Sequence, residues 1–310
     1  MKTIIETAME FFQTQLKQSD SSKQYLINRG FTEDDFDDIG VGHNPGYEVT
    51  VNHLQRNEFT QTEIDAVFPN LKALDSYQIV IPYYDPEGIL KSIWGRLSIP
   101  GNPYKDQSTY LPFTDPAPKD TLFNLHKVKG KESIVLVEGF FDALLAHQRG
   151  VNAVATADSY LRKEQIETAI GINHMTLVFD NDEAGEAGME KAILDLANAD
   201  IASDVFNYPA EFQSSGTSIK DPADFINHKG VESFKKSLDF GTEDSWFWYA
   251  FSFIDNHQDL DLFDETIVTE IAKSVVVLPE VIRNILEPDL REQLPTVALK
   301  VETLKRKKAL

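Results

Sequence analysis

Acidic residues stand directly after two short apolar runs in the middle of the 310-residue chain. The run SIVLV ends before Glu138, and the later run MTLVF ends before Asp180, with Asp182 two positions on. Three carboxylates brought to one place repel one another unless a cation neutralises them, and such hard oxygen ligands suit Mg²⁺ or Mn²⁺. The pattern therefore indicates a divalent metal site, provided that the fold brings these acids together.

The elements around these acids are expected to do so. Both apolar runs are aliphatic without alternation, which is typical of strands buried on both faces of a parallel sheet. Helical patterns follow at residues 140–150 and 183–199, so the region predicts βαβ units in a doubly wound α/β domain. Ligands in such sheets lie outside the carboxyl ends of the strands, where Glu138, Asp180 and Asp182 would converge.

The same acids allow other interpretations. Asp180 and Asp182 could simply cap the next helix, where acids favour the N-terminal dipole, but Glu138 at a second strand end favours the metal site. A calcium loop starting at Asp180 is excluded, because Ala184 and Lys191 stand where oxygen ligands are needed. A phosphotransferase of the haloacid dehalogenase type stays an alternative, although Ala184 replaces its Thr or Val.

Three motifs resemble one family specifically. The segments EGFFDAL, beginning at Glu138, and FDNDEAG, containing Asp180 and Asp182, resemble the signatures of the TOPRIM domain of DnaG-type primases, topoisomerases and some nucleases. KDPADF, which contains Asp221 and Asp224, resembles the third acidic element of the primases. The resemblance implies that Glu138, Asp180 and Asp182 are catalytic and, with Asp221 and Asp224, bind the metal.

The third motif departs from the primase pattern. The family commonly has a second acid two positions after the first, where this chain has Ala223, and Asp224 lies one position later. Asp221 therefore carries over more directly than Asp224. Either of these acids could instead cap the helix predicted to follow.

Composition narrows the classes of protein. A hydrophobic content of 42% supports a sizeable core, and no apolar run is long enough for a membrane span. The N-terminus is amphipathic and lacks the core of a signal peptide, so we expect a cytoplasmic protein. The absence of cysteine excludes disulfides, zinc-thiolate sites and cysteine nucleophiles.

Charge is distributed unevenly along the chain. The formal net charge of −21 argues against nucleic-acid binding over the whole surface, because Lys and Arg dominate contacts to phosphate. Between Gly88 and Lys131, however, seven basic residues stand against three acids, and several aromatic residues are interspersed. This segment suggests a confined phosphate-binding track, although for any single lysine a solvated loop is the simpler interpretation.

The segment from Gln78 also resembles primases. Its predicted hairpin leads to a Gly-Arg pair at Arg96, and Lys119 precedes a Leu-Phe-Asn-Leu run, as a lysine does in the family. The family's first lysine before Tyr-Leu is replaced by Thr109 here and is displaced to Lys105. The resemblance implies that Arg96, Lys105 and Lys119 contact nucleotide phosphates or the template.

We therefore predict an α/β chain in three parts. A mixed α+β subdomain is expected over residues 1–130, a TOPRIM doubly wound parallel sheet over 131–230, and a helical subdomain over 231–310. The aromatic residues Trp246 and Trp248 are expected to pack in the core of the helical part. Without cysteine the chain cannot form the thiolate-ligated zinc ribbon of DnaG-type primases, so it is either an excised catalytic domain or a stand-alone enzyme.

The resemblance implies a DNA primase, a nucleotidyltransferase that makes short RNA primers on single-stranded DNA. Its expected partners are the template and ribonucleoside triphosphates, with a replicative helicase as a further candidate and no membrane. Two alternatives stay open: a metal-dependent TOPRIM nuclease, and a noncatalytic primase-like DNA-binding module. The primase-like segment from Gln78 to Lys131 favours the first function over the nuclease.

Overall fold

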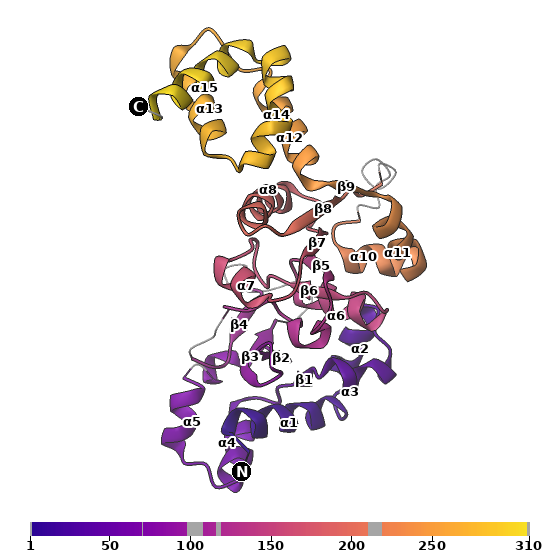
Figure 1. Ribbon diagram of the computed structural model, residues 1–310. Coiled ribbons are helices and arrows are strands. Elements are labelled where there is room, and N and C mark those ends of the chain that lie inside the picture. Colours follow the sequence, from indigo (N-terminus) through magenta and orange to yellow (C-terminus); the bar gives the residue numbers. More distant parts are fainter. Residues whose placement is uncertain (1, 70, 98–107, 116–118, 210–218, 309–310) are drawn as a thin grey trace.

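The computed structural model describes residues 2–69, 71–97, 108–115, 119–209 and 219–308. Figure 1 shows the N-terminal helices at one end, two sheets in the middle and the C-terminal helices at the other end. The first sheet is antiparallel with the order β1-β2-β3-β4, and the second has the order β6-β5-β7-β8-β9.

The N-terminal half contains the first sheet and its helices. Its helices are α1 (Ile4–Leu16), α2 (Asp20–Asn28), α3 (Phe36–Ile39), α4 (Tyr47–Arg56) and α5 (Gln61–Val67), with 3₁₀ turns η1 (Glu33–Asp35), η2 (Leu71–Leu74) and η3 (Leu125–Val128). Its strands are β1 (Gly42–His43), β2 (Ile79–Tyr84), β3 (Leu90–Arg96) and β4 (Tyr110–Pro112). The predicted hairpin is confirmed as β2 and β3, whose turn is held by the Asp85 side chain accepting the N–H groups of Glu87 and Ile89.

The second half contains the mostly parallel sheet and the remaining helices. The strands are β5 (Ser133–Val137), β6 (Ala153–Ala155), β7 (His174–Leu177), β8 (Ala202–Phe206) and β9 (Thr242–Asp244). The helices are α6 (Phe140–Gln148), α7 (Lys163–Thr168), α8 (Glu183–Asn198), α10 (Pro222–Lys229), α11 (Val231–Phe240), α12 (Ser245–His257), α13 (Glu265–Val277), α14 (Glu280–Gln293) and α15 (Pro295–Lys308). Strands β5 to β8 pair in parallel, and β9 adds an antiparallel edge.

Strand β5 lies between two hydrophobic cores, as its unbroken apolar run predicts. Ile134 and Leu136 pack in a core with α8 and the helices α12 to α15, which we call the helical core. Val135 and Val137 point to the other face, into a core shared with the first sheet and α6, which we call the central core. Successive side chains of a strand alternate between faces, so both faces of this strand are covered.

The first sheet also lies between two cores. Ile79 and Ile81 of β2 pack in the central core, whereas Val80 packs against α1, α4 and α5 in a third core. The chain is therefore a stack in which each sheet separates two apolar layers (Figure 1).

The predicted fold class is confirmed: a parallel-dominated α/β sheet follows a mixed α+β region and precedes a helical region. The boundaries at residues 130 and 230 stay predictions, and β9 from beyond the second one pairs with β8. Among the helices of the described ranges, none combines the length and apolar character needed to cross a membrane.

Candidate active site

The ends of β5 and β7 bring the predicted acids together. The two strands are parallel neighbours, with Leu136 opposite Leu177, so the residues that follow them meet at one sheet edge. There the backbone N–H of Asp180 donates a hydrogen bond of 2.9 Å to Oε1 of Glu138. The convergence expected from the sequence is therefore present for this pair.

Two further acids reach the same edge from helix starts. Asp182 caps α8 by accepting the N–H of Gly185 at 2.9 Å, and Asp221 caps α10 by accepting the N–H of Asp224 at 2.7 Å. Each cap occupies Oδ1. Capping and metal binding are therefore compatible for these two acids, because a carboxylate accepts several contacts through its two oxygens.

Asp224 points partly back into its own loop. Its Oδ2 lies 3.4 Å from the backbone N–H of Lys220, in a long hydrogen bond. It adds negative charge beside Asp221, whose pKa is raised first by burial.

Asp142 is a member of the cluster that the sequence interpretation missed. It lies in the first turn of α6, is buried, and accepts the N–H of Ala223 at 3.1 Å. Burial, and then the charge of Asp221, raise the pKa of Asp142 well above its ordinary value. Its position in the sequence could have indicated this role. Asp142 lies four residues after Glu138, in the first turn of the helix that follows β5, and such a turn lies at the carboxyl end of the strand.

Glycine is required where this turn passes the acids. A Cβ atom on Gly139 would lie 2.1 Å from Oδ2 of Asp142, and one on Gly185 would lie 2.0 Å from the carbonyl oxygen of Asp180. Both distances are far below van der Waals contact. Gly139 therefore lets the backbone approach the Asp142 carboxyl group, and Gly185 lets α8 begin against the backbone of Asp180.

The carboxyl groups act on one another electrostatically. Burial and, after it, the negative charges of Glu138, Asp142, Asp221 and Asp182, in that order, together raise the pKa of Asp180 to about 8. The pKa of Glu138 is raised by its burial and by Asp182. Such mutual repulsion is what a bound cation would relieve.

The donor set suits a hard cation, although no complete set of ligands is already formed. Oδ1 of Asp180 is buried and has no hydrogen-bond partner among the described residues, which leaves a position for a cation beside it. In the ranges that the structure describes, no three His, Cys, Asp or Glu side chains are already arranged to hold one ion. The residues fit a divalent ion by charge and chemistry, and side-chain rotation would have to complete its coordination.

Two arginines flank this cluster. The Tyr25 hydroxyl accepts hydrogen bonds from Nε of Arg29, at 2.8 Å, and from Nε of Arg96. Both guanidinium groups lie over the Phe141 ring, 5.1 Å and 5.4 Å from its centroid, and Arg96 also donates to the Tyr110 hydroxyl. The predicted residue Arg96 is thus near the site.

Arg29 is the second residue that the sequence interpretation missed. Its positive charge acts to lower the pKa values of Asp142 and Asp221, so it is close to the acids. Within the described residues, its terminal nitrogens make no hydrogen bond to protein. Nothing in the local sequence connects Arg29 with α6, and only the fold brings them together.

Lys119 is held by neighbouring protein groups. Its Nζ donates to the carbonyl oxygen of Ala157 at 2.8 Å, lies 3.4 Å from Oδ2 of Asp158, and stands 4.9 Å from the centre of the Trp94 ring. Asp158 is also paired with Arg162 at 2.5 Å. The phosphate contact expected for Lys119 stays a prediction, and Lys105 lies outside the described residues.

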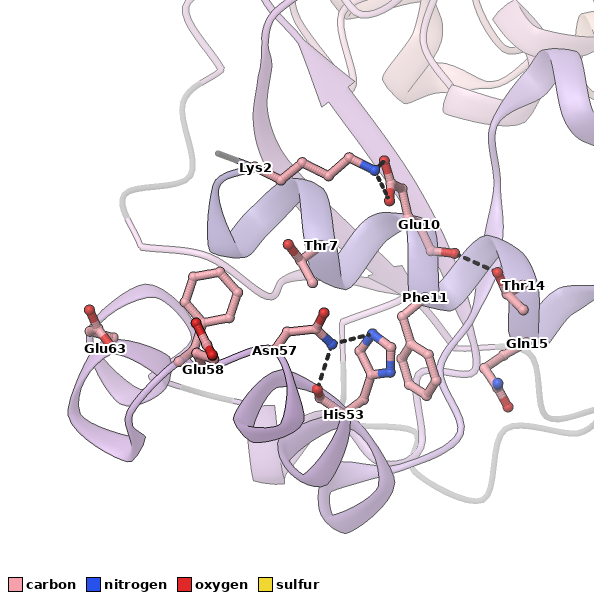
Figure 2. A pocket seen from close by; sticks show the side chains of 11 residues that line it. Lys2, Thr7, Glu10, Phe11, Thr14, Gln15, His53, Asn57, Glu58 and Glu63 are labelled. Atoms are coloured by element: carbon pink, nitrogen blue, oxygen red, sulfur yellow. Dashed lines mark hydrogen bonds and ion pairs between the residues drawn. The ribbon is translucent and has the colours of Figure 1, made fainter.

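A hollow of about 800 Å³ lies away from the acids, between α1, α4 and α5 (Figure 2). The rings of Phe11 and His53 stack in it at 3.9 Å. Lys2 pairs with Glu10 at 2.6 Å in it, and Glu63 belongs to the capping box of α5. None of the carboxylates at the sheet edge lines this hollow.

Comparisons with known proteins agree with this geometry. A Toprim-like family model matches residues 135–226, which begin within β5, extend past β8 and contain the acids. The chain is 28% identical over 255 residues to the DNA primase of Thermotoga maritima and 25% identical over 241 residues to that of Enterococcus faecalis. These matches cover 76% and 71% of the chain, and they span only 42% and 37% of the lengths of those primases.

Solved primase structures share the fold. A DnaG catalytic core matches with a TM-score of 0.72 at 20% identity, covering 95% of this chain and 98% of that one. A DnaG primase catalytic domain bound to single-stranded DNA matches with a TM-score of 0.69 at 20% identity, covering 94% and 95%. The chain is therefore similar to bacterial DNA primases, contains a Toprim-like domain and has the fold of a DnaG catalytic core.

Proposed function

We propose that this chain is the catalytic core of a DNA primase, which acts in the cytoplasm and joins ribonucleotides into a short primer on single-stranded DNA. The observation that carries the proposal is the gathering of Glu138, Asp180 and Asp221 at one sheet edge beside the cation of Arg29. Nucleotidyl transfer needs carboxylates for metal ions and cations for phosphates, and this edge offers both. Similarity to bacterial primases supports the assignment.

The metal would be Mg²⁺ or Mn²⁺, held by Glu138, Asp180, Asp182 and Asp221, with Asp224 as a further candidate ligand. Bound there, the ion would lower the pKa of the attacking hydroxyl and offset charge on the leaving pyrophosphate. The carboxylates that raise the pKa of Asp180 by repulsion provide the negative potential that attracts the ion. They are Glu138, Asp142, Asp182 and Asp221.

Glu138 would serve either as a ligand or as the general base. Its Oε1 is fixed by the N–H of Asp180, which leaves Oε2 for the reacting groups. Burial raises the pKa of Glu138, and this brings it closer to the range in which a base works best near neutral pH. As base, it would take the proton of the primer 3′-hydroxyl while that oxygen bonds to the α-phosphorus and pyrophosphate departs.

Arg29 and Arg96 would orient the phosphates. Their Nε atoms are held by one hydroxyl, that of Tyr25, so the two cations are fixed relative to each other. Arg96 comes from the segment whose sequence favours primases over nucleases, and its place beside Arg29 supports the same choice. An arginine held in this way can give two parallel hydrogen bonds to a phosphate.

Replacing Arg29 by Ala is expected to raise the KM for ribonucleoside triphosphates by about 10- to 100-fold, the loss that one charge-assisted hydrogen bond would cause. Steady-state primer synthesis at varied nucleotide concentration measures it. Arg29→Lys should recover part of the affinity, because charge remains while the fork geometry is lost. Arg56→Ala, at an exposed position of α4, is the matched control, and an unchanged KM in Arg29→Ala would remove Arg29 from the site.

The proposed activity is tested by primer synthesis. Labelled ribonucleotides are supplied with single-stranded DNA and Mg²⁺ or Mn²⁺, and the wild type is compared with Asp180→Ala. Short labelled products from the wild type alone support a primase. DNA cleavage without synthesis, lost in Asp180→Ala, would instead identify a TOPRIM nuclease, and DNA binding without either reaction would identify a noncatalytic module.

The template and ribonucleoside triphosphates are the partners that this function requires, and a replicative helicase is a further proposed partner. Solved relatives bound to single-stranded DNA and to double-stranded DNA support the contact with DNA.

A further inference from the structure

A second hollow, of about 310 Å³, opens directly beside the carboxylate cluster. It is bounded by the loop after β7, the first turns of α8, the end of β8 and the helix α12. Asp180 and Asp182 form its edge towards the cluster, and its other lining residues include Met189, Tyr208 and Trp248. Its volume lies at the lower end of the range of about 300 to 1,000 Å³ that small-molecule sites occupy.

Tyr208, one of the residues that line this hollow, carries a buried hydroxyl group without a partner in the described ranges. Tyr208 is only 8% exposed, and its hydroxyl has no hydrogen-bond partner in the described part of the chain. Buried hydroxyl groups are rarely left unbonded, because their desolvation is then uncompensated. Its ring makes an edge contact with Phe206, at 5.1 Å between centroids.

The charged residues that line the hollow indicate where the phosphates of a bound nucleotide would lie. Among the described residues that line it, the charged ones are the acids Asp180, Asp182 and Glu186, and none is a lysine or arginine. Asp180 and Asp182 would hold the metal ion that binds the phosphates, so the phosphates lie at the edge of the hollow towards the carboxylate cluster. The nearby cation Arg29, whose charge acts on Asp142 and Asp221, also favours phosphates on that side.

Trp248 supplies a flat apolar wall. It is half-buried and packs partly against the helical core, so one side of the indole is held while the residue also lines the hollow. Aromatic side chains beside a phosphate-binding site are stacking surfaces for nucleobases, since every base offers a π-face.

We propose that this hollow holds the base and sugar of a nucleotide whose phosphates lie at the carboxylate cluster, with Trp248 as stacking wall and the Tyr208 hydroxyl as hydrogen-bond donor. The assignment rests on the proposed function and adds an orientation to it. The sugar and base point towards α12, and the phosphates point towards Arg29. Core packing alone, the role expected for Trp248 from the sequence, describes only the part of its surface that contacts the helical core.

Two probes separate this site from the phosphate site. Calorimetry with Mg²⁺ compares a nonhydrolysable ribonucleoside triphosphate with tripolyphosphate, which has neither sugar nor base. Trp248→Ala should weaken binding of the nucleotide by about 10-fold and leave tripolyphosphate unchanged, as expected for the loss of one stacking contact. Tyr208→Phe should weaken only the nucleotide, by about 3- to 10-fold. Trp248→Phe should retain most of the affinity.

Phe251→Ala is the control for α12, because Phe251 lies on the same helix and is 52% exposed. Unchanged nucleotide affinity in Trp248→Ala, with a wild type that binds both probes, would overturn the base site and leave the proposed function standing. Equal weakening of both probes would also overturn it, since the change would then be structural. A wild type that binds neither probe would overturn the proposed function and the base site together.

Discussion

Asp180→Asn is expected to lower the rate of primer synthesis by about 10²- to 10³-fold, the loss typical when a group that stabilises transition-state charge is removed. The substitution keeps the size of the side chain and the backbone N–H that Glu138 accepts. It removes the charge that four neighbouring carboxylates oppose. The folded state of the variant should therefore be as stable as that of the wild type or more stable, and only the rate of primer synthesis should fall.

Incorporation of labelled nucleotides and thermal unfolding, measured on the same preparations, check this expectation. Asp195→Asn is the matched control, because Asp195 lies on α8 and its ion pair with Lys191 is at the surface. Such a pair contributes about 0 to 1 kcal/mol. Full activity in Asp180→Asn would exclude Asp180 from the site, and a lower unfolding temperature would show that its charge stabilises the fold.

Without divalent ions, the protein is expected to lose stability between about pH 7 and pH 9, and Mg²⁺ should restore it. Asp180 has a pKa of about 8 in the folded chain against an ordinary 3.8, so the folded state holds a proton that the unfolded state has released. The stability contributed by that proton is complete below about pH 4 and is lost as pH rises through about 8. Glu138 and Asp142, whose pKa values are also raised, act in the same direction.

Measuring stability between about pH 7 and pH 9 separates the titration of the carboxyl groups from that of the histidines with lowered pKa values. Burial lowers the pKa of His126 to about 4 and lowers those of His43, His53 and His147, so these imidazoles are neutral above about pH 7 in both states. Thermal unfolding with and without Mg²⁺ measures the effect, at about 2 to 4 °C for each kcal/mol in domains of 150 to 250 residues. Asp180→Asn should flatten the pH dependence and reduce the stabilisation by Mg²⁺. An equal Mg²⁺ response at both pH values would contradict a carboxylate site.

The sheet edge could be predicted from the sequence because its signals are local. The run SIVLV became β5, and Glu138 and Asp180 followed their strands to the same edge. The capping alternative was also visible in the sequence, and it is confirmed for Asp182 and Asp221.

The remaining site residues could not be predicted, because their roles depend on contacts between distant segments. Arg29 reaches the acids only because α2 packs near α6 in the folded chain. Asp142 stands among apolar residues of α6, so its sequence is typical of a helix buried in the core. Tyr208 follows a strand without any motif. Lys119 was singled out by the resemblance of its segment to primases, but the resemblance could not reveal that Asp158 would pair with it.

The shared position of β5 has a consequence for how the molecule unfolds. Ile134 belongs to the helical core and Val135 to the central core, so adjacent residues of one strand complete two different apolar layers. If either apolar layer opens, it exposes apolar surface of a strand that still packs in the other layer. Partial unfolding therefore costs free energy. Strand β5 (Ser133–Val137), only five residues long, therefore couples the stability of the central core to that of the helical core.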